Sequence, residues 1–163
     1  MTIFVTVGAQ MPFDRLVRVV DRWAEAEGRH DVFAQVGDTR APPTYIPFVR
    51  HLPPQDFRRR AEDARVLIAH AGMGSIMTAL ELGKPILVMP RRGALRETRN
   101  DHQVSTARRF LERAMIEVAF DEEDLERRLA RVDLLTAASP VTTHRLEQLL
   151  DTVRSFIGKD RRE

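Results

Sequence analysis

The sequence predicts a single α/β domain built around a mostly parallel sheet with helices on both faces. Short apolar runs alternate with amphipathic segments along the chain, which is the pattern of repeated βαβ units. Three runs, Val66–Ala69, Ile86–Met89 and Ile116–Ala119, are mainly apolar, as strands are when both of their faces are buried. With 163 residues and 43% hydrophobic content, the chain has room for one domain, and we expect residues 1–163 to form it.

The elements before residue 66 follow from local patterns. Thr2–Val7 is a β-branched run closed by Gly8, and apolar residues then recur at helical spacing from Phe13 to Ala24. Pro47 interrupts a later apolar run, which predicts an edge strand or an irregular one. The expected elements are a strand at 2–7, a helix at 13–24, strands at 32–36 and 45–49, and a helix from 53 to 64.

A helix from 142 to 157, followed by a frayed tail, is expected at the C-terminus, so that residues 142–163 form an amphipathic helix and tail. Its apolar residues fall on one stripe: Leu146, Leu149, Leu150, Val153, Phe156 and Ile157. This stripe would dock on the domain's own sheet or, alternatively, on a partner. Four acidic residues at 121–124 precede another amphipathic stretch, and a role in complementing a helix dipole is favoured over a catalytic one.

Composition excludes several classes of protein and site. The absence of cysteine excludes a disulfide framework, thiolate metal sites and a cysteine nucleophile. The net charge is only +2, and the aromatic residues (6%) do not interleave with a basic stripe, so we expect no nucleic-acid partner. No apolar run is long enough to span a bilayer, and Met1 leads directly into a strand rather than a signal peptide. We therefore expect a cytoplasmic protein.

Several familiar catalytic motifs are also missing. The sequence has no G-x-x-x-x-G-K-[ST] phosphate loop, no G-x-S-x-G nucleophile elbow, and no ligand spacing typical of zinc. It also lacks an Asp-x-Asp pair that could hold a diphosphate through a divalent ion. We expect no metal and no cofactor, so any bound diphosphate must be neutralised by helix ends, backbone N–H groups and arginine.

The strongest functional signal is a glycine turn between a strand and a helix. The turn after the strand at 66–69 contains Gly72, Met73, Gly74 and Ser75, and we expect the helix to begin near Ser75. A helix N-terminus offers unpaired N–H groups and a positive dipole end, which favour a phosphate. Ser75 could cap the helix or donate to a phosphate oxygen. An ordinary tight turn is the alternative interpretation.

Two more small-residue loops are expected at the same edge of the sheet. Gly8 and Gln10 follow the first strand, while Gln35 and Gly37 end the second. Because the carboxyl ends of parallel strands share one edge, the three loops would face one crevice of the size of a nucleotide.

Other polar residues near this edge are candidates for binding or catalysis. His70 ends a strand, where its imidazole could orient a sugar, polarise a phosphate or act as a general base; a structural histidine is the alternative. The loop before the next helix ends in groups that could pair with sugar hydroxyls, or simply cap the helix: Asn100, Asp101, His102 and Gln103. The same loop holds arginines that could face a diphosphate, anionic headgroups or solvent: Arg91, Arg92, Arg96 and Arg99.

Taken together, these segments resemble a known family. The chain is similar to the donor-binding half of GT-B glycosyltransferases, of the family 28 C-terminal domain type. Within that family it resembles the catalytic subunit of the two-part dolichol-linked N-acetylglucosaminyltransferase and bacterial PssE-type exopolysaccharide subunits. The segments that carry the resemblance are FVTVGAQMPFDRLV, FAQVG, IAHAGMGSIMTALELGKPILVMPRR and RNDHQ. The resemblance implies a Rossmann-like domain that forms the C-terminal half of a GT-B fold.

The resemblance also implies roles for particular residues. The turn from Gly72 to Ser75 would bind the diphosphate of the donor, and His102 and Gln103 would contact its sugar. In the family an acidic residue one turn into the helix holds the ribose of the nucleotide, whereas Thr78 occupies that position here. Ribose binding would therefore fall to one of three residues: Thr78, Glu81 or Glu97.

The length of the chain predicts a partner, because a GT-B enzyme closes its crevice between a donor domain and an acceptor domain. The resemblance implies a membrane-anchored, acceptor-binding subunit that recruits the chain to the inner face of the cytoplasmic membrane. The expected reaction moves a sugar from a UDP-sugar to a polyprenyl-diphosphate-linked saccharide in exopolysaccharide or other glycan synthesis, with inversion and without metal. The alternatives are a noncatalytic subunit that stabilises its partner and a self-sufficient enzyme acting on a soluble nucleotide.

Overall fold

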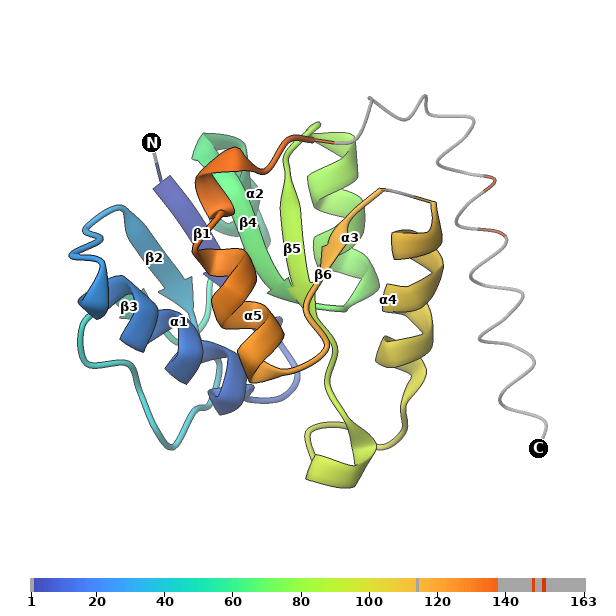
Figure 1. The fold of residues 1–163 in the computed structure, drawn as a ribbon, viewed down its shortest axis with the longest axis horizontal. Helices are drawn as coiled ribbons and strands as arrows, with labels where there is room; N and C mark the ends of the chain where they lie inside the picture. Colours follow the sequence, from blue (N-terminus) through green and yellow to red (C-terminus); the bar gives the residue numbers. More distant parts are fainter. Residues whose placement is uncertain (1, 114, 138–147, 149–150, 152–163) are drawn as a thin grey trace.

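In the computed structural model, six parallel strands of the described chain form one sheet in the order β3-β2-β1-β4-β5-β6 (Figure 1). The structure describes residues 2–113 and 115–137, together with Gln148 and Asp151. Apart from these two residues, the predicted helix at 142–157 and the tail after it lie outside the described residues. The strand order is that of a doubly wound dinucleotide-binding sheet, which confirms the predicted fold class.

The bounds of the elements agree closely with the alternation seen in the sequence. The strands are β1 (Thr2–Thr6), β2 (Val32–Gln35), β3 (Phe48–Val49), β4 (Ala64–His70), β5 (Ile86–Met89) and β6 (Glu117–Val118). The α-helices are α1 (Asp14–Ala26), α2 (Pro54–Asp63), α3 (Met73–Glu81), α4 (His102–Glu112) and α5 (Glu122–Leu129). Two short 3-10 helices complete this part: η1 (Gly93–Leu95) and η2 (Val132–Leu134).

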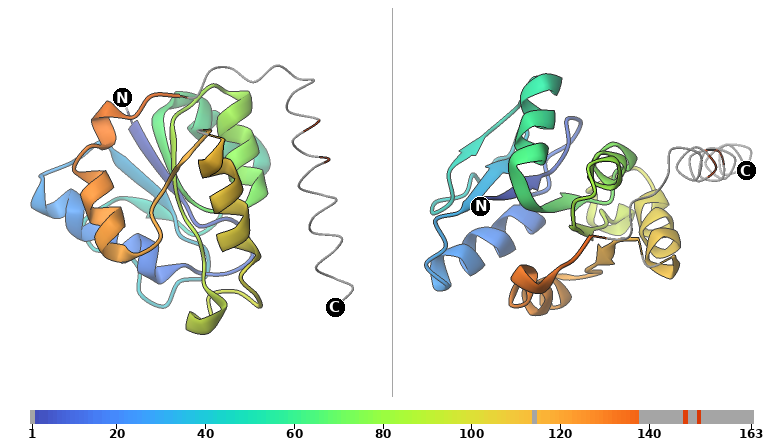
Figure 2. Two further views of the ribbon diagram at one scale, coloured as in Figure 1. Left: turned by 45° about the vertical axis from the view of Figure 1, so that its right-hand side comes forward. Right: turned by 90° about the horizontal axis from the view of Figure 1, so that it is seen from above.

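Helices cover both faces of the sheet, as predicted. One core cluster joins α1 and α5 to one face through residues such as Leu16, Val20 and Leu125. A second cluster joins α3 and α4 to the opposite face through residues such as Ile76 and Phe110. Figure 2, seen from above, shows α1 and α5 on one side of the strands and α2 and α3 on the other. The central strands are therefore buried on both faces, which explains their apolar sequences.

The strand predicted at 45–49 is reduced to two residues at the edge of the sheet. The reason lies in Asp21 of α1, whose carboxylate accepts hydrogen bonds from the N–H groups of Thr44, Tyr45 and Ile46 at 2.9–3.0 Å. These three N–H groups donate to a side chain rather than to a neighbouring strand, so the ladder begins only at Phe48. The predicted edge position is confirmed, but the predicted length is wrong.

Replacing Asp21 with Asn should lower the free energy of unfolding by about 1.5 kcal/mol, because a buried charged acceptor of several N–H groups is lost. Burial alone would raise the pKa of Asp21, but these donors outweigh it and hold the pKa below 3.8. The ionised carboxylate therefore stabilises the fold above about pH 3.8, and this contribution disappears as the pH falls through the folded-state pKa. Urea unfolding at pH 7 and at pH 3 measures both effects, with Glu25→Gln on the exposed face of α1 as the control. Equal stability of the two variants at pH 7 would contradict this role.

The carboxyl ends of the central strands are level with one another. Thr6 of β1 pairs with Ala69 of β4 and with Gln35 of β2, and His70 of β4 pairs with Met89 of β5. The strand order reverses between β1 and β4, because earlier strands extend the sheet on one side and later strands on the other. Open α/β sheets bind ligands at the carboxyl edge at such a reversal. The loops after β1 and β4 therefore flank the expected position of a ligand.

Candidate functional site

The N-terminus of α3 lies at the reversal of strand order and presents free backbone donors. The helix begins at Met73, two residues earlier than predicted, with Gly72 as its N-cap. The first N–H group that bonds within the helix is that of Ile76, which donates to the Gly72 carbonyl at 3.2 Å. The N–H groups of Met73, Gly74 and Ser75 precede it and have no helical carbonyl to donate to. This end of α3 is therefore suited to bind an anion.

Gly74 leaves the approach to these N–H groups open. The residue is exposed, and a Cβ atom built on it would meet nothing within 4 Å. Ser75, by contrast, is the third residue of the helix and is buried, with 5% of its surface exposed. Of the two roles predicted for Ser75, capping of the helix is wrong, because the helix starts before it; donation to a phosphate oxygen stays a prediction. The backbone N–H of Ser75 still belongs to the unpaired set.

His70 fills the space between the loops that follow β1 and β4. A Cβ atom on Gly8 would lie 2.6 Å from His70 Cε1, and one on Gly72 would lie 2.0 Å from His70 Nε2. Both positions therefore require glycine, and Gly8 also has a left-handed φ of +77°. The imidazole sets the spacing of the two loops.

The environment of His70 does not support its predicted catalytic role. Burial, together with the nearby charge of Arg91, lowers the pKa of His70 to about 4. Its Nδ1 atom is buried without a hydrogen-bond partner. At pH 7 the imidazole is neutral, and with such a low pKa it is a weak general base. The alternative interpretation, a structural histidine, fits these observations better.

Arg91 was predicted to face a diphosphate, anionic headgroups or solvent, but its side chain points into the protein. Its guanidinium donates to the carbonyl of Val7 at 2.7 Å and to that of Met11, and it lies 5.3 Å from the centre of the Phe13 ring. The residue is 4% exposed, and burial lowers the pKa of its guanidinium, which nevertheless stays charged at neutral pH. Arg91 thus joins the loop after β5 to the loop after β1, and it is not free to contact a diphosphate directly.

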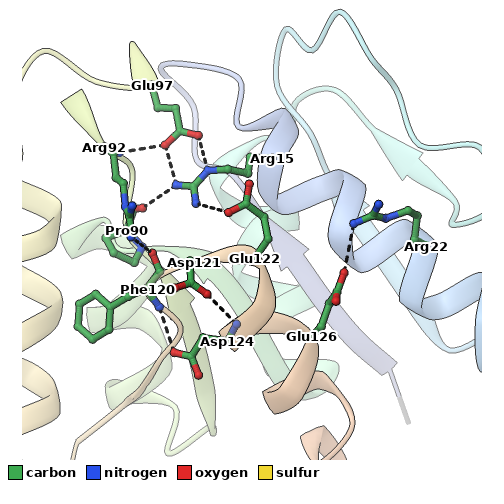
Figure 3. A network of polar contacts seen from close by, with 10 residues as sticks. All are labelled: Arg15, Arg22, Pro90, Arg92, Glu97, Phe120, Asp121, Glu122, Asp124 and Glu126. Carbon is green, nitrogen blue, oxygen red and sulfur yellow. Dashed lines mark hydrogen bonds and ion pairs between the residues drawn. The ribbon is translucent and has the colours of Figure 1, made fainter. Parts of the chain in front are cut away.

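The three candidates for ribose binding lie in different places. The carboxylate of Glu97 accepts two hydrogen bonds from Arg15, at 2.7 and 2.8 Å, and one from the Arg92 N–H at 2.9 Å (Figure 3). Glu81 is the last residue of α3, at the opposite end from the unpaired N–H groups, and lies 3.6 Å from Arg58 of α2. Thr78 is one turn into α3, and its hydroxyl donates to the Gly74 carbonyl at 2.9 Å. Thr78 thus lies within the first turns of α3, whereas the carboxylates of Glu81 and Glu97 contact arginines of this chain; which of the three residues binds a ribose stays a prediction.

Among the predicted site residues at the ends of β1 and β2, some are part of the sheet or its turns and one is exposed. Gln35 is buried, and its Oε1 accepts the hydroxyl of Thr6 at 2.8 Å, so its side chain belongs to the sheet. Gly37 has a φ of +61°, which turns the chain after β2. Gln10 is exposed in the loop after β1, and its role in binding stays a prediction.

The polar residues at the start of α4 serve mainly to shape their loop. Asp101 accepts the N–H of Gly93 at 2.8 Å, and Gln103, which is buried, accepts the N–H of Arg91 at 3.1 Å. Asn100 accepts the N–H of His102 at 3.4 Å, and both of these residues are exposed. Asp101 is the N-cap residue of α4, as the capping interpretation predicted, but its side chain makes no capping hydrogen bond. The Asn100 side chain also contacts Nδ1 of His102, and binding of a sugar by these two residues stays a prediction.

Arg15 is a residue of this region that sequence reasoning missed. It lies on α1, and its partner Glu97 is 82 positions away in the chain. No local spacing links the two residues, because the pairing depends on how α1 and the loop after β5 meet in space.

Comparison with known proteins identifies the family. The model of the glycosyltransferase family 28 C-terminal domain matches residues 2–145. The chain belongs to this family. The predicted relationship to the C-terminal half of GT-B glycosyltransferases is thereby confirmed, and the chain is a glycosyltransferase family 28 C-terminal domain. No curated protein sequence matches the chain significantly.

Solved structures with low sequence identity share the fold. The NMR structure of ALG13 is 19% identical, with a TM-score of 0.62, and the match covers 91% of this chain and 94% of that one. MurG from Acinetobacter baumannii is 16% identical, with a TM-score of 0.61, and the match covers 94% of this chain and 49% of that one. The glycotransferase of kitacinnamycin is 18% identical, with a TM-score of 0.60 and coverages of 95% and 40%. The family 28 domain described here thus spans less than half the length of the last two proteins. Among its described helices, none is long and apolar enough to cross a bilayer.

Proposed function

We propose that this family 28 domain is the donor-binding, catalytic subunit of a two-component glycosyltransferase. It would transfer a sugar from a UDP-sugar to a polyprenyl-diphosphate-linked saccharide, in the synthesis of an exopolysaccharide or another glycan. The observation that carries the proposal is the open N-terminus of α3, placed where the strand order of the sheet reverses. A diphosphate is the group in a nucleotide sugar that such a site would bind.

The chemistry follows from the charge that develops on the leaving group. As the bond from the sugar to UDP breaks, negative charge grows on the diphosphate. The N–H groups of Met73, Gly74 and Ser75 are fixed in place by α3, so they would stabilise this charge without reorganisation. Arg91 would add a buried positive charge behind the loop. These groups could neutralise the diphosphate without a metal, and we further propose that the transfer inverts the configuration at the sugar, as the resemblance to the family implies.

The general base and the acceptor site would come from a second chain. His70, the candidate base predicted in this chain, has a pKa of about 4 and is a poor base at neutral pH, which supports a base on the second chain. The match to nearly all of the ALG13 chain, but to only about half of MurG, supports a domain that works as a separate subunit. We propose that a membrane-anchored partner binds the lipid-linked acceptor and recruits this chain to the inner face of the cytoplasmic membrane.

The proposal is tested by reconstitution. The chain is co-purified with a membrane-anchored protein of acceptor-half size, and the complex is given a panel of UDP-sugars with polyprenyl-diphosphate-linked acceptors. We expect transfer by the complex, and little or no transfer by either chain alone. Full activity of the partner alone, together with no binding of UDP-sugar by this chain, would instead establish a noncatalytic, stabilising subunit. Turnover of a soluble nucleotide by the isolated chain would indicate a self-sufficient enzyme.

A further inference from the structure

Arg15 is placed where α1, α5 and the loop between β5 and α4 meet (Figure 3). Its guanidinium forms a two-pronged pair with the Glu97 carboxylate at 2.7 and 2.8 Å. It also donates to Glu122 of α5 at 3.2 Å and to the carbonyl of Pro90 at 3.3 Å. The side chains of Arg15 and Glu97 are only 10% and 13% exposed, so solvent screens this pair far less than a surface pair.

Glu97 connects Arg15 to the backbone of the loop in which Glu97 lies. Its second oxygen also accepts the N–H of Arg92, which closes the segment from 92 to 97 into a ring. Arg96, within that ring, has a left-handed φ of 56°, a conformation that non-glycine residues rarely adopt. Such a backbone persists only when surrounding contacts hold it. The pair between Arg15 and Glu97 is one such contact, and it joins this segment to α1.

The loop held in this way lies at the same edge of the sheet as the proposed donor site, because it follows the carboxyl end of β5. It begins after β5, beside His70 in the sheet, and ends with the exposed Asn100 and His102 at the start of α4. We propose that Arg15 is a positioning residue for the nucleotide-sugar donor, acting through Glu97 on the loop from 90 to 101. This inference rests on the proposed function, and Arg15 itself need not touch the donor.

Electrostatics are consistent with this role. Burial by itself lowers the pKa of Arg15, but the hydrogen bonds and charge of Glu97 and Glu122 outweigh burial, and the pKa is raised. The guanidinium of Arg15 is therefore charged throughout the neutral range. A buried charge that loses its partner is costly, so removing either member should release the loop.

The chain offers a matched control. Arg22 lies on the same helix, two turns further on, and forms an ion pair with Glu126 of α5 at 3.2 Å (Figure 3). That pair also joins α1 to α5, but it is exposed, at 62% and 54%, and does not contact the loop. Removing it tests whether α1–α5 contact alone affects the donor site.

The experiment compares the wild-type chain with Arg15→Met, Arg15→Lys, Glu97→Gln, the double variant Arg15→Met/Glu97→Gln, and Arg22→Met. UDP affinity is measured by calorimetry, and hydrogen exchange of the peptides covering 90–101 is measured by mass spectrometry. We expect Arg15→Met to weaken UDP binding by about tenfold and to speed exchange in the loop. Arg15→Lys should recover part of the affinity, the double variant should be no worse than its poorer single variant, and Arg22→Met should match the wild type.

The outcomes separate this inference from the proposed function. If the wild-type chain binds UDP and Arg15→Met binds it equally well, the positioning role is wrong and the proposed function stands. The same conclusion follows if exchange in the loop is unchanged, or if Arg22→Met weakens binding as much as Arg15→Met does. If the wild-type chain binds no UDP although exchange in the loop responds to Arg15→Met, the proposed function fails and the donor-positioning role fails with it.

Discussion

Gly74→Val is expected to reduce UDP binding by roughly a hundredfold or more while leaving the protein folded. A Cβ atom on Gly74 would meet no protein atom within 4 Å, so the added side chain enters open space rather than the core. Cβ atoms on a helix tilt toward its N-terminus, which here is the end that holds the unpaired N–H groups. The valine side chain would therefore occupy the volume in which we propose that the diphosphate lies.

A graded series separates obstruction from misfolding. Gly74→Ala should bind UDP with intermediate affinity, and thermal unfolding should show that both variants are at least as stable as the wild type, because glycine is a poor helix former. Glu81→Ala, at the opposite end of the same helix, is the control and should bind UDP as the wild type does. Wild-type affinity in a folded Gly74→Val protein would remove the basis for the proposed donor site.

The free energy of unfolding should fall by about 3 kcal/mol as the pH drops from 7 to 4, because the folded protein buries His70 in its neutral form. The pKa of His70 is about 4 in the folded protein and 6.5 in an unfolded chain. Between these values the unfolded chain takes up a proton that the folded protein does not. Above pH 6.5 the folded protein therefore has its full stability with respect to His70. This part of the free energy of unfolding is lost as the pH falls toward 4.

Denaturant unfolding between pH 7 and pH 5 isolates this effect from the titration of carboxylates, and about 2 kcal/mol of the loss should occur in that range. His70→Gln should be less stable at pH 7, because its side chain fills the space between Gly8 and Gly72 differently, but its stability should vary less with pH. His51→Gln, at a half-exposed histidine paired with Asp38, is the control for loss of a histidine. An equal pH dependence in wild type and His70→Gln would show that His70 is accessible to protons in the folded state, and would reopen its catalytic role.

The architecture of this domain was largely predictable, because it depends on local patterns. Apolar runs buried on both faces, helical spacing between them and glycine at the turns determined a parallel sheet with helices on both sides. The turn at Gly72 and Gly74 was found in the same way, since a helix N-terminus after a buried strand is a local feature. The short length of β3 could not be predicted in this way, because Asp21 on a distant helix accepts hydrogen bonds from the N–H groups of the predicted strand.

The sequence by itself thus determined the fold, the edge of the sheet where a ligand would bind, and the open backbone at α3. Only the tertiary structure decided which polar side chains face that edge. Arg91 donates to a carbonyl 84 positions away, and Glu97 binds an arginine 82 positions away, so both turn inward although their sequence neighbourhood is that of a binding loop. The physical reason is that periodicity determines which face of an element is buried, whereas the partner of a buried charge is set by whichever distant group the fold brings within hydrogen-bonding distance.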